Sequence, residues 1–272
     1  MIHNPVLGAI IGDMIGVPYE FLRYGAQVRP DFPLWKDEST FSDDSVMTLA
    51  VAKWLLESED YDCKVLIKCM QELGRKYRDR GYGSNFGAWL DSDNPKPYNS
   101  WGNGSAMRVS PIGCLNGSDM AIDTLAIKSA SVSHNHPEGI NGARAITDFI
   151  FYIREGKHDL NWIKKLVEET YGYDLSRTPQ QIIDAGYKFH VSCQESVPEA
   201  ICCFLNSNSY EETVRKAILL RGDTDTQACM AGALAAAYWG IPEDIAEEGK
   251  DRLPENLYII LSKFSNKYNL DL

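Results

Sequence analysis

Near its N-terminus the chain reads Asn4-Pro-Val-Leu-Gly-Ala-Ile-Ile-Gly-Asp-Met-Ile15. Its apolar residues recur at steps of three and four, which is the period of one face of an α-helix. Asn4 is a preferred N-cap residue, and Pro5 suits the first helical position because its ring fixes a helical φ. The segment therefore predicts a helix that begins at Pro5.

The same period continues through most of the 272 residues. We predict further helices over 45–57, 63–80, 119–132, 138–155, 179–206, 210–220, 226–239 and 255–268. The pairs His136-Pro137 and Thr178-Pro179 repeat the signature of a cap followed by proline. Alternation of period two is nearly absent, and no linker rich in Gly, Ser or Pro interrupts the chain. The sequence thus predicts an all-α fold, arranged as one compact domain over residues 1–272.

Composition excludes several classes of protein. The apolar share of 44% and the charged share of 24% are ordinary for a soluble globular protein. The 27 basic and 38 acidic residues give a net charge of −11, which argues against binding to nucleic acid or to an anionic membrane. The uncharged stretch 226–242 is mostly Ala and Gly and falls short of the ~20 strongly apolar residues of a membrane span. We expect a buried helix there, in a soluble enzyme that holds cations.

The seven cysteines are odd in number and form no C-x-x-C pair. Cys202 and Cys203 are adjacent, and neighbours in sequence do not bond each other in ordinary disulfide geometry. A reducing compartment is therefore favoured. The N-terminus has no basic region followed by an apolar run, so no secretory signal is expected and we predict a cytoplasmic protein.

Polar residues concentrate where predicted helices start. Ser42-Asp43-Asp44-Ser45 and Asp223-Thr224-Asp225-Thr226 each stand directly before an apolar helical run. The simpler interpretation is a capping cluster that offsets the helix dipole, but one cap needs one oxygen and the second segment offers four. An EF-hand is excluded, because its sixth and twelfth positions would here be Ala228 and Leu234.

Clustered carboxylates repel one another unless positive charge lies between them. The oxygen atoms of Asp, Ser and Thr suit hard divalent cations such as Mg²⁺ or Mn²⁺. Two such ions about 3.5–4 Å apart, bridged by one carboxylate, are a usual arrangement for metal-assisted displacement. The sequence therefore favours a dinuclear metal site at converging helix ends.

Two further segments contain glycine or histidine close to a helix start. Gly102-Asn103-Gly104-Ser105 resembles an anion-binding turn, but Met107 stands where a third glycine would fall, so alone it indicates an ordinary loop. His134 and His136 have no third soft ligand at zinc-motif spacing. In the simpler interpretation, His136 caps a helix and His134 is a turn residue. In the alternative, His134 contacts a ligand.

Taken together and in order, five segments resemble the ADP-ribosylglycohydrolase family. They are 8–20 (GAIIGDMIGVPYE), 42–45 (SDDS), 102–113 (GNGSAMRVSPIG), 133–143 (SHNHPEGINGA) and 222–232 (GDTDTQACMAG). The resemblance implies an orthogonally packed all-α fold that holds two Mg²⁺ or Mn²⁺ ions. It implies hydrolysis of the glycosidic bond between ADP-ribose and an acceptor. An arginine side chain is the expected acceptor, and serine, an O-acetyl group or another ADP-ribose are the alternatives. The partners would be ADP-ribosylated proteins or small ADP-ribose conjugates.

The resemblance also assigns roles to residues. The metal ligands would be Ser42, Asp43, Asp44, Asp223, Asp225 and Thr226, with Asp225 bridging the two ions. The diphosphate would bind at Gly102, Asn103, Gly104 and Ser105, and Met107 and His134 would lie near the substrate. Glu20 would sit on a mobile loop over the site, and either Glu20 or Asp44 would transfer the proton. Ser42 replaces the commoner threonine but keeps its hydroxyl.

Two other functions are open at this point. A non-catalytic binder of ADP-ribose or a nucleotide would need fewer carboxylates than the chain presents. The second alternative is a Mg²⁺-dependent phosphohydrolase or a prenyl-diphosphate enzyme. A prenyl-diphosphate enzyme would require the motif Asp-Asp-x-x-Asp. The third position after Asp44 is Met47, which does not fit that motif.

Overall fold

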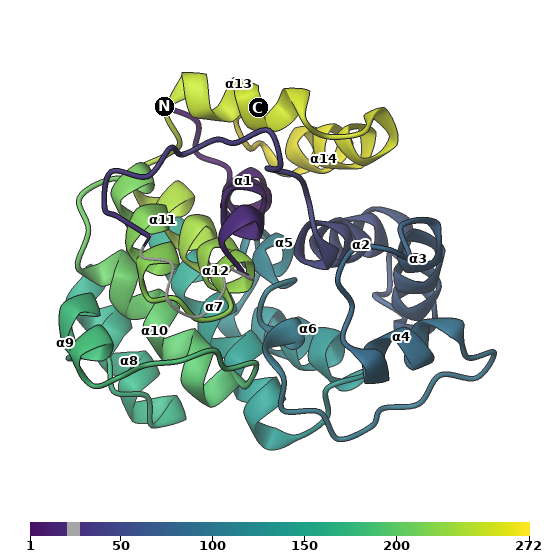
Figure 1. Cartoon of the computed structure of the whole chain (residues 1–272). Coiled ribbons are helices and arrows are strands. Elements are labelled where there is room, and N and C mark those ends of the chain that lie inside the picture. Colours follow the sequence, from purple (N-terminus) through teal and green to yellow (C-terminus); the bar gives the residue numbers. More distant parts are fainter. Residues whose placement is uncertain (21–27) are drawn as a thin grey trace.

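The computed structural model describes residues 1–20 and 28–272 (Figure 1). Its helices are α1 (Pro5–Glu20), α2 (Asp43–Glu57), α3 (Cys63–Lys76), α4 (Ser84–Asp91), the 3₁₀ turn η1 (Asn103–Ser105), α5 (Ser110–Gly113), α6 (Asp119–Ser131), α7 (Pro137–Glu155), α8 (Leu160–Tyr171), α9 (Pro179–Asp184), α10 (Cys193–Leu205), α11 (Tyr210–Leu219), α12 (Thr224–Tyr238), α13 (Glu243–Asp251) and α14 (Glu255–Tyr268). Over these described ranges there is no strand, only isolated bridges that join Ile2 to Ile241 and Gly102 to Ser192. The predicted all-α class is confirmed.

Helices α1 and α12 lie against each other at the centre of the molecule (Figure 1). Both are buried on nearly every side. Gly8, Gly12 and Gly16 line the contact at four-residue spacing, and a Cβ added to Gly12 would lie 2.1 Å from the carbonyl oxygen of Ala228. Because no side chain separates them, the two backbones touch. A Cβ on Gly16 would lie 2.4 Å from Cα of Asp225, so this contact also brings the start of α12 to the last turn of α1.

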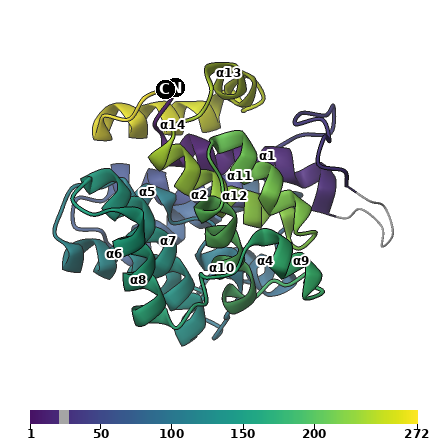
Figure 2. The ribbon, with the colours of Figure 1, turned by 90° about the vertical axis from the view of Figure 1, so that its left-hand side faces the viewer.

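The other helices cover this central pair. Helices α10 and α11 pack on α12, and α7 joins them from the side of α6 and α8 (Figure 2). Helix α2 contacts α1, α3 and α14. The two ends of the chain lie side by side, since Asn4 Nδ2 donates to the carbonyl of Asp271 at 2.8 Å. Within the described residues, no helix has both the length and the apolar character that a membrane crossing needs.

The predicted helix caps at Asn4, His136 and Thr178 are confirmed. Asn4 Oδ1 accepts the backbone N–H groups of Val6 and Leu7, each at 3.1 Å. His136 caps α7 by accepting from the amide of Glu138, and Thr178 forms a full capping box at the start of α9. These polar side chains satisfy N–H groups that have no partner inside the helix.

The single helix predicted over 179–206 is wrong. Helix α9 ends at Asp184 and α10 begins only at Cys193. Gly186 has a φ of +81°, a left-handed conformation that interrupts the helix, and the chain then runs beside the glycine segment. There the carbonyl of Val191 accepts the amide of Asn103 at 2.8 Å, so this segment bonds across to another part of the chain.

Four helices were not predicted: α4, α5, α8 and α13. Helices α4 and α5 are short, and α13 is mostly charged and buries only Ile245, Ala246 and Gly249. Helix α8 did carry a signal, because Asp159 caps it and Ile163 and Val167 form a buried stripe.

Candidate metal and substrate site

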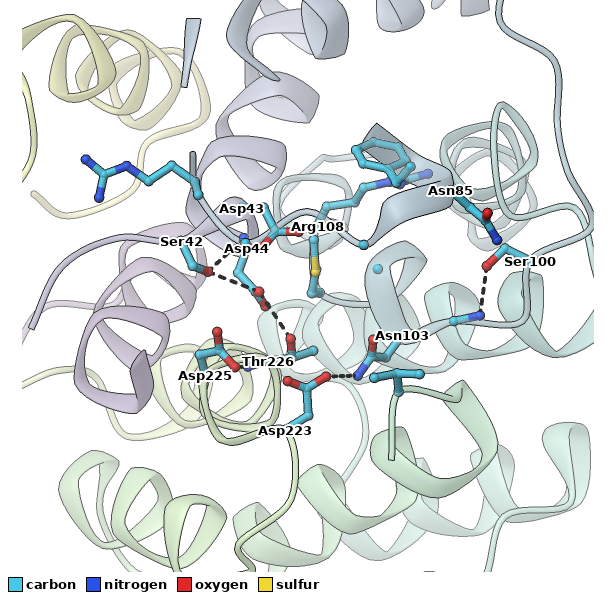
Figure 3. A pocket seen from close by; sticks show the side chains of 18 of the residues that line it. Ser42, Asp43, Asp44, Asn85, Ser100, Asn103, Arg108, Asp223, Asp225 and Thr226 are labelled. Carbon is cyan, nitrogen blue, oxygen red and sulfur yellow. Dashed lines mark hydrogen bonds between the residues drawn. The ribbon is translucent and has the colours of Figure 1, made fainter. Parts of the chain in front are cut away.

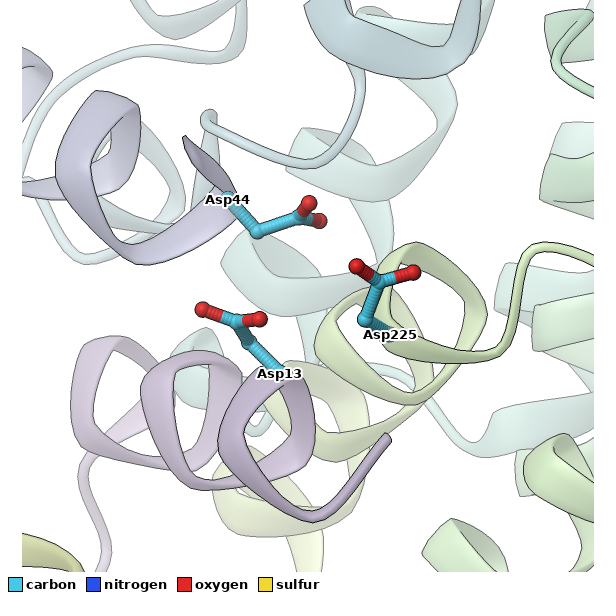
Figure 4. A group of neighbouring side chains, drawn as sticks. All are labelled: Asp13, Asp44 and Asp225. Atoms are coloured by element: carbon cyan, nitrogen blue, oxygen red, sulfur yellow. The ribbon is translucent and has the colours of Figure 1, made fainter. Parts of the chain in front are cut away.

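Carboxylates from the starts of α2 and α12 and from the middle of α1 come together beneath a cavity, part of whose lining Figure 3 shows. Asp44 stands in the first turn of α2, Asp225 in the first turn of α12, and Asp13 on the buried face of α1. One oxygen atom from each of these three lies within 4.8 Å of the other two (Figure 4). Asp225 also belongs to a second group of the same closeness, together with Glu20 and Asp223. Asp225 is thus shared by two adjacent carboxylate groups.

Hydrogen bonds hold two of these carboxylates in place (Figure 3). Asp44 Oδ2 accepts from the hydroxyl of Thr226 at 3.1 Å and from that of Ser42 at 3.3 Å. Asn103 Nδ2 donates to Asp223 Oδ2 at 2.7 Å. The segment 223–226 therefore meets both the segment 42–45 and the glycine segment, through bonds that join residues 182 and 120 positions apart in the chain.

Asp13 is the site residue that sequence reasoning gave no role. Its Oδ2 accepts the amides of Ser42 at 3.0 Å and Ser45 at 3.1 Å, together with the hydroxyl of Ser45. These bonds fix the first turn of α2 to α1. The signal in the sequence was a lone carboxylate inside an apolar helix, since a buried charge needs partners. By contrast, Asp43 lines the cavity but lies outside both carboxylate groups.

Glu20 is the last residue of α1 rather than part of a loop, and it is half-buried. Its neighbours along the chain, residues 21–27, lie outside the described part. Glu20 therefore faces Asp223 and Asp225 from a helix end.

Burial raises the pKa of every carboxyl in this cluster, and repulsion from neighbouring carboxylates adds to it at Glu20, Asp44, Asp223 and Asp225. Burial is the larger cause for Asp44 and Asp225, and their charged neighbours add to it, so both pKa values lie well above the usual range. For the same reasons the pKa of Glu20 rises to about 8. The pKa of Asp223 rises only to about 6, because the bond from Asn103 opposes the effect of burial. Crowded carboxylates of this kind favour a bound cation.

The donor set fits a hard divalent cation. Among the described residues, Asp13 Oδ1 and Asp44 Oδ1 are buried and accept no hydrogen bond. A buried oxygen without a partner is costly, and a cation would satisfy it. All candidate ligand atoms are oxygens, which Mg²⁺ and Mn²⁺ prefer.

The cavity above the carboxylates has a volume of about 780 Å³. Of the residues predicted to bind substrate, Gly102, Asn103, Gly104, Met107 and His134 line it. Ser105 does not, because its buried hydroxyl donates to the carbonyl of Gly139 at 2.6 Å. Phe86, Tyr98, Trp101, Phe189 and Val191 add an apolar wall that sequence reasoning largely missed. Such a volume accommodates a ligand of nucleotide size.

The fold and the carboxylate groups place the protein in the class of all-α proteins with a candidate metal site. The solved structure of an ADP-ribosylglycohydrolase-related protein complex has this fold, with a TM-score of 0.65, 21% identity and coverage of 97% of this chain and 98% of that one. The sequence model of the ADP-ribosylglycohydrolase family matches residues 2–267, so the chain belongs to this family of glycohydrolase enzymes.

Two relatives illustrate the range of the family. ADP-ribosylhydrolase ARH3 of Homo sapiens is 28% identical, over 94% of this chain and 92% of its own. ADP-ribosylarginine hydrolase Tri1 of Pseudomonas putida is 23% identical, over 87% of this chain and 70% of its own. The resemblance stated from the sequence motifs is confirmed.

Stabilisation of the fold by a divalent cation is expected to increase with pH. The folded, metal-free protein has carboxyl pKa values raised to about 6 at Asp223 and about 8 at Glu20. A carboxyl whose pKa is higher in the folded than in the unfolded protein favours folding when the pH is below its unfolded pKa. This contribution is lost as the pH rises through its folded pKa. A cation reverses that loss, so the rise in Tm on adding Mn²⁺ should be several degrees larger near pH ~8 than near pH ~5. Scanning calorimetry measures this, and a shift that is equal or smaller at the higher pH contradicts it.

Proposed function

We propose that the protein is a metal-dependent hydrolase that cleaves the bond between ADP-ribose and an acceptor, with ADP-ribosyl-arginine on protein as the preferred substrate. The observation that carries this proposal is the pair of carboxylate groups that share Asp225 under a cavity of nucleotide size. Pure binding of ADP-ribose would not need so many buried carboxylates, because each one costs free energy.

We assign one divalent cation, Mg²⁺ or Mn²⁺, to the side of Ser42, Asp43 and Asp44. The second is assigned to Asp223 and Thr226, with Asp225 between the two. The assignment of Asp44 and Asp225 is supported by their shared group, whereas that of Asp43 rests on its place in the cavity wall. Asp13 would support the first ion indirectly, since its carboxylate fixes the turn that carries Asp44.

In the reaction, the bond between the anomeric carbon of the ribose and the acceptor breaks through an oxocarbenium-like state, water bonds to that carbon, and the proton that water loses balances the one that the departing acceptor gains. Divalent cations at such a site supply Lewis-acid stabilisation and neutralise the carboxylates. Glu20 is assigned the proton transfer because it is half-buried and borders the cavity. Asp44, the other candidate, is buried and already accepts hydrogen bonds from Ser42 and Thr226, which suits holding an ion.

The glycine segment is assigned to the diphosphate. The amides of Gly102 and Asn103 are already bonded, to Ser100 Oγ at 3.1 Å and to the carbonyl of Val191 at 2.8 Å. We therefore assign the anion to the next turn, around Gly104, where the start of a helical turn exposes N–H groups. Met107 and His134 lie beside that turn, and Trp101 and Tyr98 offer aromatic faces to a base.

Arginine as acceptor is supported by two observations. One relative is named an ADP-ribosylarginine hydrolase. In addition, the exposed carboxylate of Asp79 borders the cavity and can pair with a guanidinium group. Serine, O-acetyl and ADP-ribose polymer acceptors lack that positive charge and are the alternative substrates.

A panel of substrates tests the proposal. Peptides ADP-ribosylated on arginine or serine, O-acetyl-ADP-ribose and ADP-ribose polymer would be incubated with the protein and Mg²⁺ or Mn²⁺, and released ADP-ribose measured. The proposal predicts the fastest release from arginine and none in the presence of a chelator. Binding of free ADP-ribose without release from any substrate would instead establish the non-catalytic alternative.

Gly104→Val is expected to weaken ADP-ribose binding by about tenfold or more while leaving Mn²⁺ binding unchanged. A Cβ at this position would lie 3.2 Å from His134 Nε2 and 3.9 Å from Met107 Cε, so the larger side chain fills the space beside the glycine segment. Isothermal titration calorimetry with each ligand measures both effects. Equal losses of both affinities would indicate a folding defect and would contradict the assignment of this turn.

A further inference from the structure

Behind the glycine segment, three side chains form a buried hydrogen-bonded row. Arg108, Ser133 and His134 are exposed by only 1%, 0% and 5%. Arg108 Nη2 donates to Ser133 Oγ at 3.0 Å, and Ser133 Oγ lies 2.8 Å from His134 Nδ1. The row therefore joins a buried cation to an imidazole, and both Arg108 and His134 border the cavity.

Arg108 has no carboxylate partner among the residues that the structure describes. Its Nη2 is held instead by the carbonyl of Ser129 at 2.6 Å, and the guanidinium lies 5.9 Å from the ring centre of Phe86. Burial lowers the pKa of Arg108 to about 10, so it stays charged at neutral pH. A guanidinium only donates hydrogen bonds, so Ser133 Oγ is the acceptor in its bond with Arg108.

The number of available donors and acceptors also decides which atom donates in the bond between Ser133 and His134. Ser133 Oγ accepts from Arg108 and has one proton to give. Within the described part of the chain its other hydrogen-bond partner is His134 Nδ1. If Nδ1 carried a proton and donated to Ser133, the serine hydroxyl would be left buried with no acceptor, which is costly. Nδ1 is therefore the acceptor of the Ser133 proton.

The imidazole is neutral. Burial, and after it the charge of Arg108, hold the pKa of His134 well below its usual value. A neutral ring carries one proton, and with Nδ1 accepting, that proton is on Nε2. Nε2 faces the glycine segment, since it lies 3.2 Å and 3.5 Å from where a Cβ on Gly104 or Gly102 would stand.

We infer that Arg108 and Ser133 are positioning residues that hold His134 in the Nε2–H tautomer, so that its Nε2–H donates to an oxygen of bound ADP-ribose beside Gly104. The identity of that ligand rests on the proposed function, whereas the tautomer does not. Through Ser133, the buried cation of Arg108 keeps His134 as a neutral hydrogen-bond donor at the cavity wall. A neutral donor binds an oxygen without adding a titrating charge.

The ring nitrogens of His134 test this directly by ¹⁵N NMR of the intact protein, with His134→Gln used to assign the signals. The expected result is a protonated Nε2 and an unprotonated Nδ1 near neutral pH, in the absence of substrate. A protonated Nδ1, or a doubly protonated ring, overturns the inference. Because no substrate is present, this result is independent of the activity panel, which alone decides the proposed function.

A matched pair of variants tests the positioning role. Ser133→Ala removes the donor to Nδ1 and is expected to shift the Nδ1 resonance and weaken ADP-ribose binding by about tenfold. Ser110→Ala makes the same change at a buried hydroxyl that has no hydrogen-bond partner among the described residues, and should alter neither. An Nδ1 resonance and an ADP-ribose affinity that are both unchanged in Ser133→Ala contradict the role.

Discussion

Asp225→Asn is expected to lower the hydrolysis of ADP-ribosyl-arginine by about 1000-fold or more and to abolish tight binding of Mn²⁺. Asp225 is shared by both carboxylate groups, so its loss removes a ligand from each proposed ion at once. Lewis-acid stabilisation by such ions is worth several kcal/mol, and each ~1.4 kcal/mol corresponds to a factor of ten in rate. Steady-state turnover and calorimetric titration with Mn²⁺ measure the two effects.

Asparagine keeps the shape of the side chain, and the fold should survive. Removing one of several crowded buried carboxylates relieves repulsion, so the metal-free variant should be at least as stable as the native protein. Asp148→Asn is a suitable control, because it changes a partly buried aspartate of α7 that accepts from Tyr171 at 2.6 Å, outside the site. If Asp225→Asn kept near-native turnover, the bridging role of this residue would be wrong.

Gly12→Ala is expected to destabilise the fold by about 3 kcal/mol or more, enough to reduce the yield of folded protein severely. The new Cβ would lie 2.1 Å from the carbonyl oxygen of Ala228 and 2.6 Å from its carbonyl carbon. These are backbone atoms of α12, so no side-chain rotation can make room. Helices α1 and α12 would have to separate, and with them Asp13 and Asp225.

Chemical denaturation followed by circular dichroism measures this loss of stability. Gly117→Ala is the control, because its Cβ would meet Ile122 at an ordinary contact distance of 3.5 Å. Equal stability of both variants would show that α1 and α12 do not rely on direct backbone contact.

The fold class and much of the candidate site follow from local sequence signals. The caps at Asn4, His136 and Thr178 are read from residue type and position, because a helix start needs a side-chain acceptor whatever surrounds it. The acid-rich segments stand out for a similar reason, since they offer more oxygens than capping requires. That they meet is a tertiary fact, which the surplus of carboxylates favoured and the resemblance to a family implied, but which no local pattern determines.

What the sequence did not provide depends on packing between distant segments. Gly186 was a local signal for the end of α9, but the segment that follows it pairs through Val191 with Asn103, a contact that no local pattern contains. Asp13 went unassigned because its partners Ser42 and Ser45 lie about 30 positions away. Ser105 has the right residue type, but its hydroxyl turns to the carbonyl of Gly139. Side-chain direction within a turn is fixed by its neighbours in space.

Electron paramagnetic resonance of the protein titrated with Mn²⁺ examines the paired-cation account most directly, because it reports both the number of bound ions and their magnetic coupling. Two Mn²⁺ ions per chain with an exchange-coupled spectrum are expected, and Asp225→Asn should abolish the coupling. A single bound ion, or two uncoupled ions that persist in Asp225→Asn, would contradict it.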